Sequence, residues 1–205
     1  MPGRGDGGPP EDAPWPEIEA WRGRQRGRLI KLRQSMPEEV RRQAGAEVLA
    51  RIDAAFPGLA AETIGFTWPF KAEIDTRDFV AEKVAAGVQA ALPVVVAKNR
   101  PLEFWRWQPG DPLDSGVLGI PIPARREVVV PSVLLAPLLG FDGAGYRLGY
   151  GGGYYDRTLA SFAQRPYVIG LGFSACRLES IRPQPHDIAM DVIVTEAGLW
   201  RTPKA

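Results

Sequence analysis

Cysteine and histidine are nearly absent from this chain of 205 residues, which contains only Cys176 and His186. A lone cysteine rules out a disulfide within the chain and a zinc site built from thiolates. A lone histidine rules out a histidine-rich metal centre, and a serine–histidine triad would have to use His186. Because His186 stands next to Asp187, we expect these two residues to form a structural hydrogen-bonded pair.

A strong charge of one sign is also missing, since 25 basic residues are balanced by 24 acidic ones and the net charge is +1. The chain therefore lacks the overall basic field that draws a protein to nucleic acid. It has no apolar run long enough to span a bilayer, and its N-terminus has no apolar signal core. We expect a cytoplasmic monomer that binds neither nucleic acid nor a membrane.

The order of apolar and polar stretches predicts the fold. Residues 1–16 are rich in glycine, proline and acidic side chains, so we expect a disordered tail. Residues 17–205 are expected to form one α/β domain, because helical patterns alternate with apolar stretches typical of buried strands. The result would be a three-layer arrangement around a mostly parallel sheet, with an N-terminal helical arm. The expected helices are 17–33, 35–56, 75–87 and 154–164, and the expected strands are 62–68, 88–97, 102–107, 133–139, 167–173 and 191–195.

The most informative stretch is the glycine-rich run Arg147–Arg157, Arg-Leu-Gly-Tyr-Gly-Gly-Gly-Tyr-Tyr-Asp-Arg. Glycine weakens regular elements, so this run marks backbone that bends sharply or lets a ligand come close. The helix expected after it would offer free N–H groups and a positive dipole end, which attract anions. The run has neither the Gly-Lys-Ser/Thr of a Walker A loop nor the spacing of a dinucleotide fingerprint. A phosphate-binding loop and a tight structural turn both remain open on this pattern alone.

The N-terminal helix carries a basic run without a single acidic residue. One interpretation is a solvated face; the other is that one face of the helix returns to the glycine loop and supplies positive charge to phosphates. Arg22 and Arg26 lie four residues apart and so share a helix face. The run consists of Arg22, Arg24, Arg26, Arg28, Lys31 and Arg33.

Glu73 and two tryptophans are further candidates. Glu73 follows the strand expected at 62–68, and loops at the carboxyl ends of parallel strands commonly bind ligands. It is either an acceptor for a substrate N–H or a plain surface glutamate. Trp105 and Trp107 would point to the same side of a strand, which is more typical of a core than of a ligand pocket.

Taken together, these stretches resemble the 5-formyltetrahydrofolate cyclo-ligase family, whose members are also called methenyltetrahydrofolate synthetases. The glycine-rich run resembles the family's Arg-Leu-Gly-x-Gly-x-Gly-Tyr-Tyr-Asp stretch. The order and spacing of the similar stretches hold from about Trp21 to Trp200. The supporting stretches are Pro137–Asp142, Glu73–Thr76, Gly119–Pro121, His186–Asp187 and Thr195–Glu196.

The resemblance implies an ATP- and Mg²⁺-dependent ligase that converts 5-formyltetrahydrofolate to 5,10-methenyltetrahydrofolate. In the implied mechanism ATP phosphorylates the formyl oxygen, N10 of the folate attacks the activated carbon, and phosphate leaves as the second ring closes. Such phosphoryl transfer needs positioning and charge neutralisation more than a covalent protein nucleophile. The implied fold is Rossmann-like, of the NagB/RpiA/CoA-transferase type.

For the nucleotide and the metal, the resemblance implies roles along the glycine run and the N-terminal helix. Arg147 and Asp156 would be catalytic. Asp156, with Asp142 as the second choice, would ligate Mg²⁺, which prefers one or two carboxylates beside phosphate oxygens. The implied nucleotide contacts are Arg22, Arg26, Arg147, Leu148, Gly149, Tyr150, Gly151, Gly152, Gly153, Tyr154 and Tyr155.

For the folate, the resemblance implies that Glu73 is catalytic and accepts hydrogen bonds from the pterin or orients N10. Aromatic side chains are expected to line the slot for the pterin. These are Trp68, Phe70 and Trp107, with Trp105 as a weaker candidate.

The chain departs from the family pattern at three places. Arg22-Gly-Arg-Gln-Arg26 stands where the family has Lys-x-x-Leu-Arg, and Tyr150 and Gly152 fill places at which many members carry a second basic residue. The loop should therefore depend on Arg147 and on arginines from the N-terminal helix. Ile122 stands where an acid or amide is often found, which leaves open a related ATP-using enzyme with a different acceptor. The basic run leaves open a folate- or RNA-binding regulator.

Overall fold

The apolar stretches of the sequence form an eight-stranded sheet in the computed structural model, which describes residues 8–202 apart from the side chains of residues 60 and 61. The five central strands run parallel, and antiparallel strands close both edges of the sheet. The order across the sheet is β12-β11-β10-β7-β1-β2-β3-β6. The strands are β1 (Thr63–Gly65), β2 (Gln89–Val94), β3 (Glu103–Trp107), β6 (Val128–Val129), β7 (Val133–Pro137), β10 (Tyr167–Leu171), β11 (Val192–Thr195) and β12 (Gly198–Arg201).

The direction of the strand order changes at β1. The chain first adds β2 on one side of β1 and later adds β7, and then β10 and β11, on the other side. In open α/β sheets ligands bind at such a switch point, beyond the carboxyl ends of the strands. The loops that leave β1 and β7 are therefore the ones that should carry the site.

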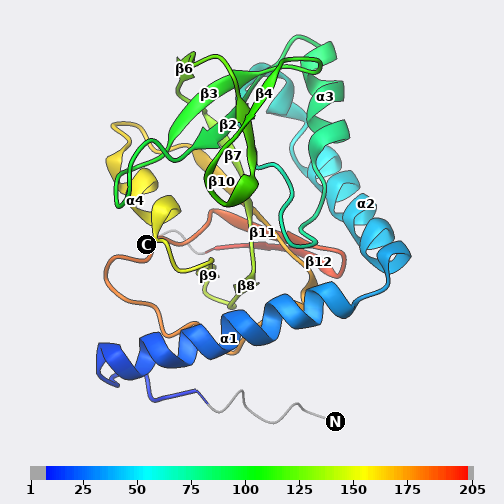
Figure 1. Ribbon diagram of the computed structural model, residues 1–205. Coiled ribbons are helices and arrows are strands. Elements are labelled where there is room, and N and C mark those ends of the chain that lie inside the picture. The colour runs from blue at the N-terminus through cyan, green and yellow to red at the C-terminus, as the bar shows by residue number, and fades with distance from the viewer. Residues whose placement is uncertain (1–7, 203–205) are drawn as a thin grey trace.

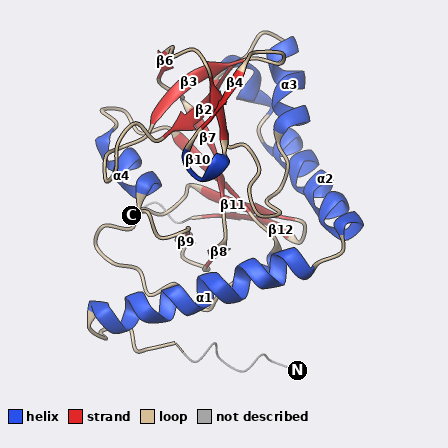
Figure 2. Cartoon of the chain, in the orientation of Figure 1, coloured by secondary structure: helices blue, strands red, loops and turns tan. Residues whose placement is uncertain are grey.

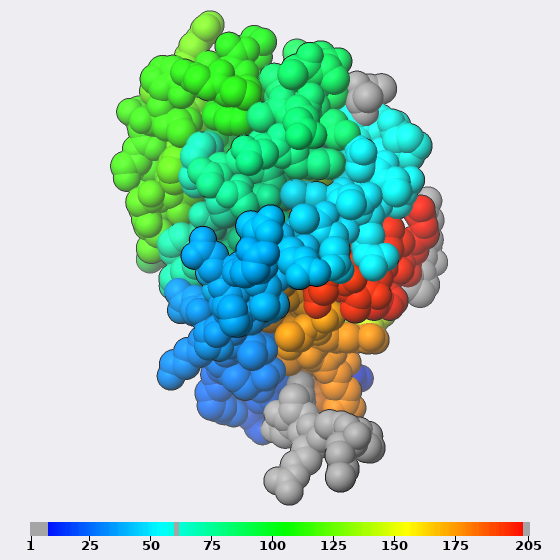
Figure 3. All heavy atoms as spheres, turned by 90° about the vertical axis from the view of Figure 1, so that its right-hand side faces the viewer, coloured from blue at the N-terminus to red at the C-terminus, as the bar shows by residue number. Residues whose placement is uncertain are grey.

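Helices cover both faces of the sheet, and strand β7 shows why. Its side chains alternate, so Val133 and Leu135 enter one apolar cluster while Leu134 and Ala136 enter the other. The first cluster is covered by α2 (Glu38–Ala55) and α3 (Arg77–Ala85), and the second by α4 (Tyr154–Ser161) (Figure 1). Figure 2 shows the strands between these helices, and Figure 3 shows α2 on the outer surface of the first layer.

Helix α1 (Trp15–Ser35) belongs to neither layer, because it lies across the loops at the carboxyl ends of the strands (Figure 1). Trp21 and Leu29 are buried there in a third apolar cluster with Leu139 and Leu148. The helix also buries polar side chains, which suits an edge made of loop backbone with free carbonyl groups. The expected helical arm is therefore docked over the place where the switch point of the sheet lies.

Smaller elements complete the chain. Two hairpins of short strands and three 3₁₀ turns connect the main elements. The segment 140–145 is the first strand and the turn of one hairpin. These elements are β4 (Leu113–Ser115) with β5 (Pro121–Pro123), β8 (Gly140–Phe141) with β9 (Arg147–Leu148), η1 (Pro57–Ala61), η2 (Val117–Gly119) and η3 (Ser174–Cys176).

The predicted α/β fold with a mostly parallel sheet is confirmed, while the expected tail was drawn too long. Helix α1 starts at Trp15 with Pro16 in its first turn, and Pro9 is buried and accepts a 2.6 Å hydrogen bond from Arg182 Nε. Residues 1–7 of that tail lie outside the described residues.

The sequence did not indicate β4, β6 or β12. Within residues 8–202, no helix has the length and apolar character needed to cross a membrane.

Candidate active site

The glycine loop, residues 149–153, leads from β9 into α4 at the carboxyl edge of the sheet. Gly151 and Gly153 have φ angles of +95° and +61°, a left-handed conformation that other residues rarely adopt. A Cβ on Gly153 would lie 2.8 Å from Arg157 Nη1, at the end of a flexible side chain, so conformation more than space favours glycine there. The loop thus brings its backbone close to an arginine and ends at the positive end of a helix, as an anion-binding loop does.

Three arginines surround this loop. Arg26 Nε donates a 2.9 Å hydrogen bond to the carbonyl of Gly149, and Arg157 Nη2 donates one of 2.5 Å to the carbonyl of Gly152. Arg147 Nη2 pairs with Asp156 Oδ2 at 2.9 Å. The buried Nε atoms of Arg147 and Arg157 have no hydrogen-bond partner among the described residues. A bound anion would satisfy such donors, which cost free energy when left unpaired.

The electrostatics of the loop also favour an anion. The pKa of Arg26 is lowered from its ordinary value, first by burial and then by repulsion from Arg22. Negative charge at the loop would relieve both effects. The structure thereby supports the interpretation in which the basic helix returns to the glycine loop.

The tyrosines of the run support the arginines. Tyr154 and Tyr155 open α4, and the guanidinium of Arg157 lies 5.1 Å from the Tyr154 ring centre. That of Arg147 lies 4.8 Å from the Tyr155 ring centre, and burial raises the pKa of the Tyr155 hydroxyl. Leu148 is buried in the cluster beneath α1. These residues hold the loop and its arginines in place by packing.

Glu73 lies at the same edge, on the loop that follows β1. Its side chain is only 5% exposed and lies 4.0 Å from Arg33. Oε2 accepts a 3.0 Å hydrogen bond from the Phe70 N–H, and Oε1 accepts one of 2.8 Å from the Tyr150 hydroxyl. Burial raises the pKa of Glu73, although both hydrogen bonds and the charge of Arg33 oppose that rise. Glu73 is not the plain surface glutamate that remained open on sequence.

The backbone beside Glu73 is strained. Lys71 and Ala72 have φ angles of 47° and 61°, which side-chain-bearing residues seldom adopt outside functional sites. The carbonyls of Phe70 and Lys71 both accept hydrogen bonds from Arg33. Hydrogen bonds from Arg33 of α1 therefore hold the strained turn in place beside the carboxyl group of Glu73.

Arg33 is the residue that the sequence-based selection missed. Its side chain is 1% exposed, and its Nη2 donates to the Tyr150 hydroxyl at 2.5 Å. Further N–H groups reach the carbonyls of Lys71 at 2.8 Å and Leu138 at 3.3 Å. The sequence does contain a signal that points to Arg33 as a site residue. Arg33 lies seven residues, or two helical turns, after Arg26 and so shares its face of the helix.

The aromatic candidates separate into two groups. Phe70 is half-buried and contacts Tyr150 edge to face at 5.7 Å, and Trp68 is half-buried with Arg77 over its ring at 5.1 Å. Trp107 is 6% exposed and belongs to the core, so it offers no free face for stacking and its expected contact with the pterin is wrong. Trp105 is engaged with Glu103 through its Nε1 at 2.8 Å.

Arg22 was expected to contact the nucleotide, and the structure corrects this. Its guanidinium pairs with Asp187 at 2.6 Å and donates to the carbonyls of Ile181 and Arg182 at 2.9 and 2.8 Å. Its donors are thus spent on fastening α1 to the C-terminal segment. The expected His186–Asp187 pair is also wrong, because Asp187 is taken by Arg22.

His186 instead contacts Trp15 edge to face, with ring centres 5.6 Å apart. Trp15 in turn lies 5.5 Å from the guanidinium of Arg22. His186 is thus part of the packing at the start of α1.

Asp142 was the second choice as a metal ligand, and its contacts assign it to a turn. Its Oδ1 accepts the N–H groups of Ala144 and Tyr146, and its Oδ2 accepts that of Ile181. Asp156 has one contact on each oxygen, from Arg147 and from the Ile188 N–H. Within residues 8–202 no group of three or more His, Cys, Asp or Glu side chains is placed to hold a metal. A Mg²⁺ ion held partly by phosphate oxygens would need only one or two carboxylates, and Asp156, whose oxygens have one contact each, would fit that role.

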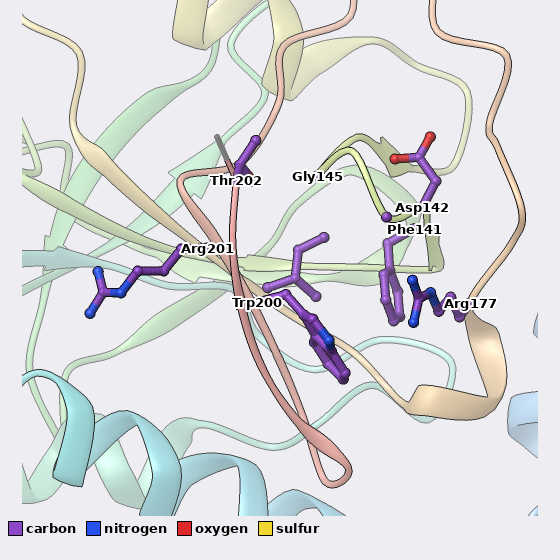
Figure 4. A pocket seen from close by; sticks show the side chains of 9 residues that line it. Phe141, Asp142, Gly145, Arg177, Trp200, Arg201 and Thr202 are labelled. Carbon is purple, nitrogen blue, oxygen red and sulfur yellow. The ribbon is translucent and has the colours of Figure 1, made fainter. Parts of the chain in front are cut away.

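A cavity beside Asp142 has a different character (Figure 4). Its volume is about 10 Å³, and Phe141, Arg177, Trp200 and Thr202 are among the residues that line it. This volume suits one water molecule, which could bind the Thr202 hydroxyl, a group without a hydrogen-bond partner in the described part of the chain. The cavity is too small for a nucleotide or a pterin and is not part of the candidate site.

The switch point of the sheet, the glycine loop and the buried arginines form a candidate site for an anionic ligand in an α/β protein. A sequence model of the 5-formyltetrahydrofolate cyclo-ligase family matches residues 18–196, and the chain belongs to this family. Among similar proteins is the 5-formyltetrahydrofolate cyclo-ligase of Escherichia coli strain K12, which is 30% identical over 177 residues. That match covers 82% of this chain and 96% of the relative.

Solved structures agree with this assignment. The NMR structure of the Aquifex aeolicus 5,10-methenyltetrahydrofolate synthetase has a TM-score of 0.77 and 28% identity, and the match covers 90% of this chain and 94% of that one. The 5,10-methenyltetrahydrofolate synthetase of Mycoplasma pneumoniae has a TM-score of 0.71 at 21% identity, covering 85% of this chain and 98% of that one. The second structure shows likeness of fold alone.

The correction at Arg22 is testable. Arg22→Ala should lower the free energy of unfolding by about 3 kcal/mol, because it leaves Asp187 without its buried partner. Arg24→Ala, an exposed position on the same helix, is the matched control and should change stability by less than about 0.5 kcal/mol. Both are measured by denaturant unfolding. Equal stability of the two variants would contradict the structural role of Arg22.

Proposed function

We propose that the chain catalyses the ATP-dependent conversion of 5-formyltetrahydrofolate to 5,10-methenyltetrahydrofolate, with release of ADP and phosphate. Family membership carries the reaction. One structural observation supports its location: the Tyr150 hydroxyl, from the glycine loop, donates to Glu73 at the carboxyl edge of the sheet. A phosphate-binding loop and a buried carboxylate are thus adjacent, as a transfer from nucleotide to folate requires.

The nucleotide part of the proposal assigns the phosphates to the backbone of the glycine loop and to Arg26, Arg147 and Arg157. The buried Nε atoms of Arg147 and Arg157, which have no hydrogen-bond partner within residues 8–202, support this assignment. Asp156 would hold Mg²⁺ together with phosphate oxygens, and the ion would neutralise charge on the transferred group. Phosphate binding would compete with Asp156 for Arg147, which would free that carboxylate for the ion.

The folate part of the proposal assigns Glu73 to the N–H groups of the pterin or to the orientation of N10. Each carboxylate oxygen accepts one hydrogen bond in the structure, so each has a further lone pair for a substrate. Phe70 and Trp68 would border the pterin ring. The Glu73 side chain is little exposed, so water has little access to its carboxyl group.

The chain's residues then act in a defined order. The glycine loop and its arginines hold the nucleotide with its terminal phosphoryl group toward the formyl oxygen. Glu73 holds the folate so that N10 faces the formyl carbon once its oxygen carries the phosphoryl group. Charge neutralisation by the arginines favours departure of phosphate as N10 closes the ring.

The setting of the reaction is part of the same proposal. We infer a cytoplasmic monomer without a nucleic-acid partner. Two facts speak against a nucleic-acid partner: the net charge is +1, and Arg22, Arg26 and Arg33 of the basic run make internal contacts. The RNA-binding alternative loses part of its sequence support, because only Arg24, Arg28 and Lys31 of the run are exposed.

A direct assay tests the function. Purified protein with Mg-ATP and 5-formyltetrahydrofolate should produce the new absorbance band of methenyltetrahydrofolate and release ADP. Controls omit ATP or Mg²⁺ in turn. ATP turnover without the new band would point to a different acceptor, the alternative that Ile122 leaves open, and folded protein without either product would overturn the proposal.

Arg147→Ala should reduce kcat/KM at least about 100-fold, because it removes charge stabilisation at the transferred group. The measurement is the absorbance assay, with Arg125→Ala, an exposed arginine, as the control. A rate equal to that of the wild type would remove Arg147 from the site.

Glu73→Gln should impair the use of folate and leave nucleotide binding intact, because an amide lacks the negative charge that accepts and orients N–H groups. Calorimetric titration with a non-hydrolysable ATP analogue and steady-state KM values for the folate separate the two effects. Loss of nucleotide binding in this variant would contradict the assignment of Glu73 to the folate.

A further inference from the structure

The hydroxyl of Tyr150 lies between a buried cation and a buried carboxylate. Arg33 Nη2 donates to it at 2.5 Å, and it lies 2.8 Å from Glu73 Oε1 and 3.5 Å from the carbonyl of Phe70. A tyrosine hydroxyl has one hydrogen to donate. Because Arg33 is a donor only, that hydrogen points to the nearer acceptor, which is Glu73. The three side chains form a directed chain of hydrogen bonds that starts in α1 and ends at the carboxylate.

This chain joins the two halves of the site. Tyr150 is part of the glycine loop, between Gly149, whose carbonyl accepts from Arg26, and Gly151, where an added Cβ would meet Arg26 at 3.3 Å. Its ring packs against Phe70 at 5.7 Å. Any ligand that fixes the loop backbone therefore fixes the hydroxyl that holds Glu73.

We propose that Tyr150 and Arg33 are positioning residues that hold the carboxyl group of Glu73 in its substrate-accepting orientation and link its placement to occupation of the glycine loop. The inference rests on the proposed function for its effect on turnover, but its geometry stands on the hydrogen bonds alone. This link makes acceptance of the folate depend on the nucleotide loop.

The charges around Glu73 determine in which direction its pKa should change when the Tyr150 hydroxyl is removed. The facing groups are Arg33 from α1, Tyr150 from the glycine loop and Tyr155 from α4. Burial favours the neutral carboxyl group, whereas the hydrogen bond from Tyr150 and the charge of Arg33 favour the carboxylate. Burial also raises the pKa of Tyr150, so its hydroxyl keeps its proton and remains a donor at neutral pH. Removing that donor must raise the pKa of Glu73 further.

The test uses Tyr150→Phe, which keeps the ring contacts and removes only the hydroxyl. Tyr167→Phe is the matched control, because the Tyr167 hydroxyl contacts Arg201 at the opposite end of the parallel strands. In protein labelled with ¹³C at glutamate carboxyl carbons, the Glu73 signal is assigned by its loss in Glu73→Gln. Its pKa should rise in Tyr150→Phe and stay unchanged in Tyr167→Phe. An unshifted Glu73 pKa in both variants overturns the proposal, whatever the enzyme's activity.

Kinetics provide the second arm. The acid limb of the pH profile of kcat/KM for 5-formyltetrahydrofolate should move to higher pH in Tyr150→Phe, because Glu73 acts as the carboxylate. We expect kcat to fall about tenfold at neutral pH, while KM for ATP stays within about twofold. A uniform loss of activity with an unmoved pH profile would indicate a merely structural role and contradict the proposal.

The link to the loop needs its own measurement. A non-hydrolysable ATP analogue should move the Glu73 carboxyl signal in the wild-type protein and leave it nearly unmoved in Tyr150→Phe. Equal responses would overturn the coupling. A wild-type protein without turnover would refute the proposed function, and the signal of Glu73 in the unliganded protein would still decide whether Tyr150 positions it.

Discussion

The buried guanidinium of Arg33 is the interaction on which the site depends. A charge that is 1% exposed needs partners for its donors, and it finds them on three separate segments: the turn after β1, the segment after β7 and the glycine loop. The first two segments leave β1 and β7, the adjacent strands at the switch point of the sheet, and the glycine loop follows β9. The cost of leaving this cation unpaired therefore favours the one arrangement in which α1, Glu73 and the glycine loop meet.

The parts of the fold that the sequence predicts are those governed by local pattern. The continuous apolar run in β2 and the alternating clusters along β7 follow from side-chain periodicity, and the glycine loop follows from backbone chemistry. Contacts between distant segments were not predictable in this way. Arg22 and Arg33 look alike in the sequence, yet one faces Asp187 and the other faces Tyr150. Their roles differ because α1 lies across the strand ends, which places Arg22 against the C-terminal segment and Arg33 against the candidate site.

Burial and local contacts also distinguish candidate residues of the same type. Trp68 and Trp107 are neighbours in space, but Trp107 is enclosed by the core and Trp68 remains partly open. Asp142 and Asp156 both lie near the glycine run in sequence, yet three backbone N–H groups occupy Asp142. Short polar residues in turns commonly bind their own backbone, and sequence alone does not reveal when they do so.

The position of α1 has a consequence for how the protein is made. The helix precedes every strand of the sheet in the sequence, but Gly23 and Gly27 weaken it by about 1 kcal/mol each when it stands alone. The partner of its Arg22, Asp187, lies 165 residues later in the chain. Contacts so distant in sequence form late, because closing a long loop costs entropy before it gains any contact. On the ribosome, the candidate site is therefore among the last parts of the protein to assemble, and a chain that ends before Asp187 would lack this contact together with β11 and β12.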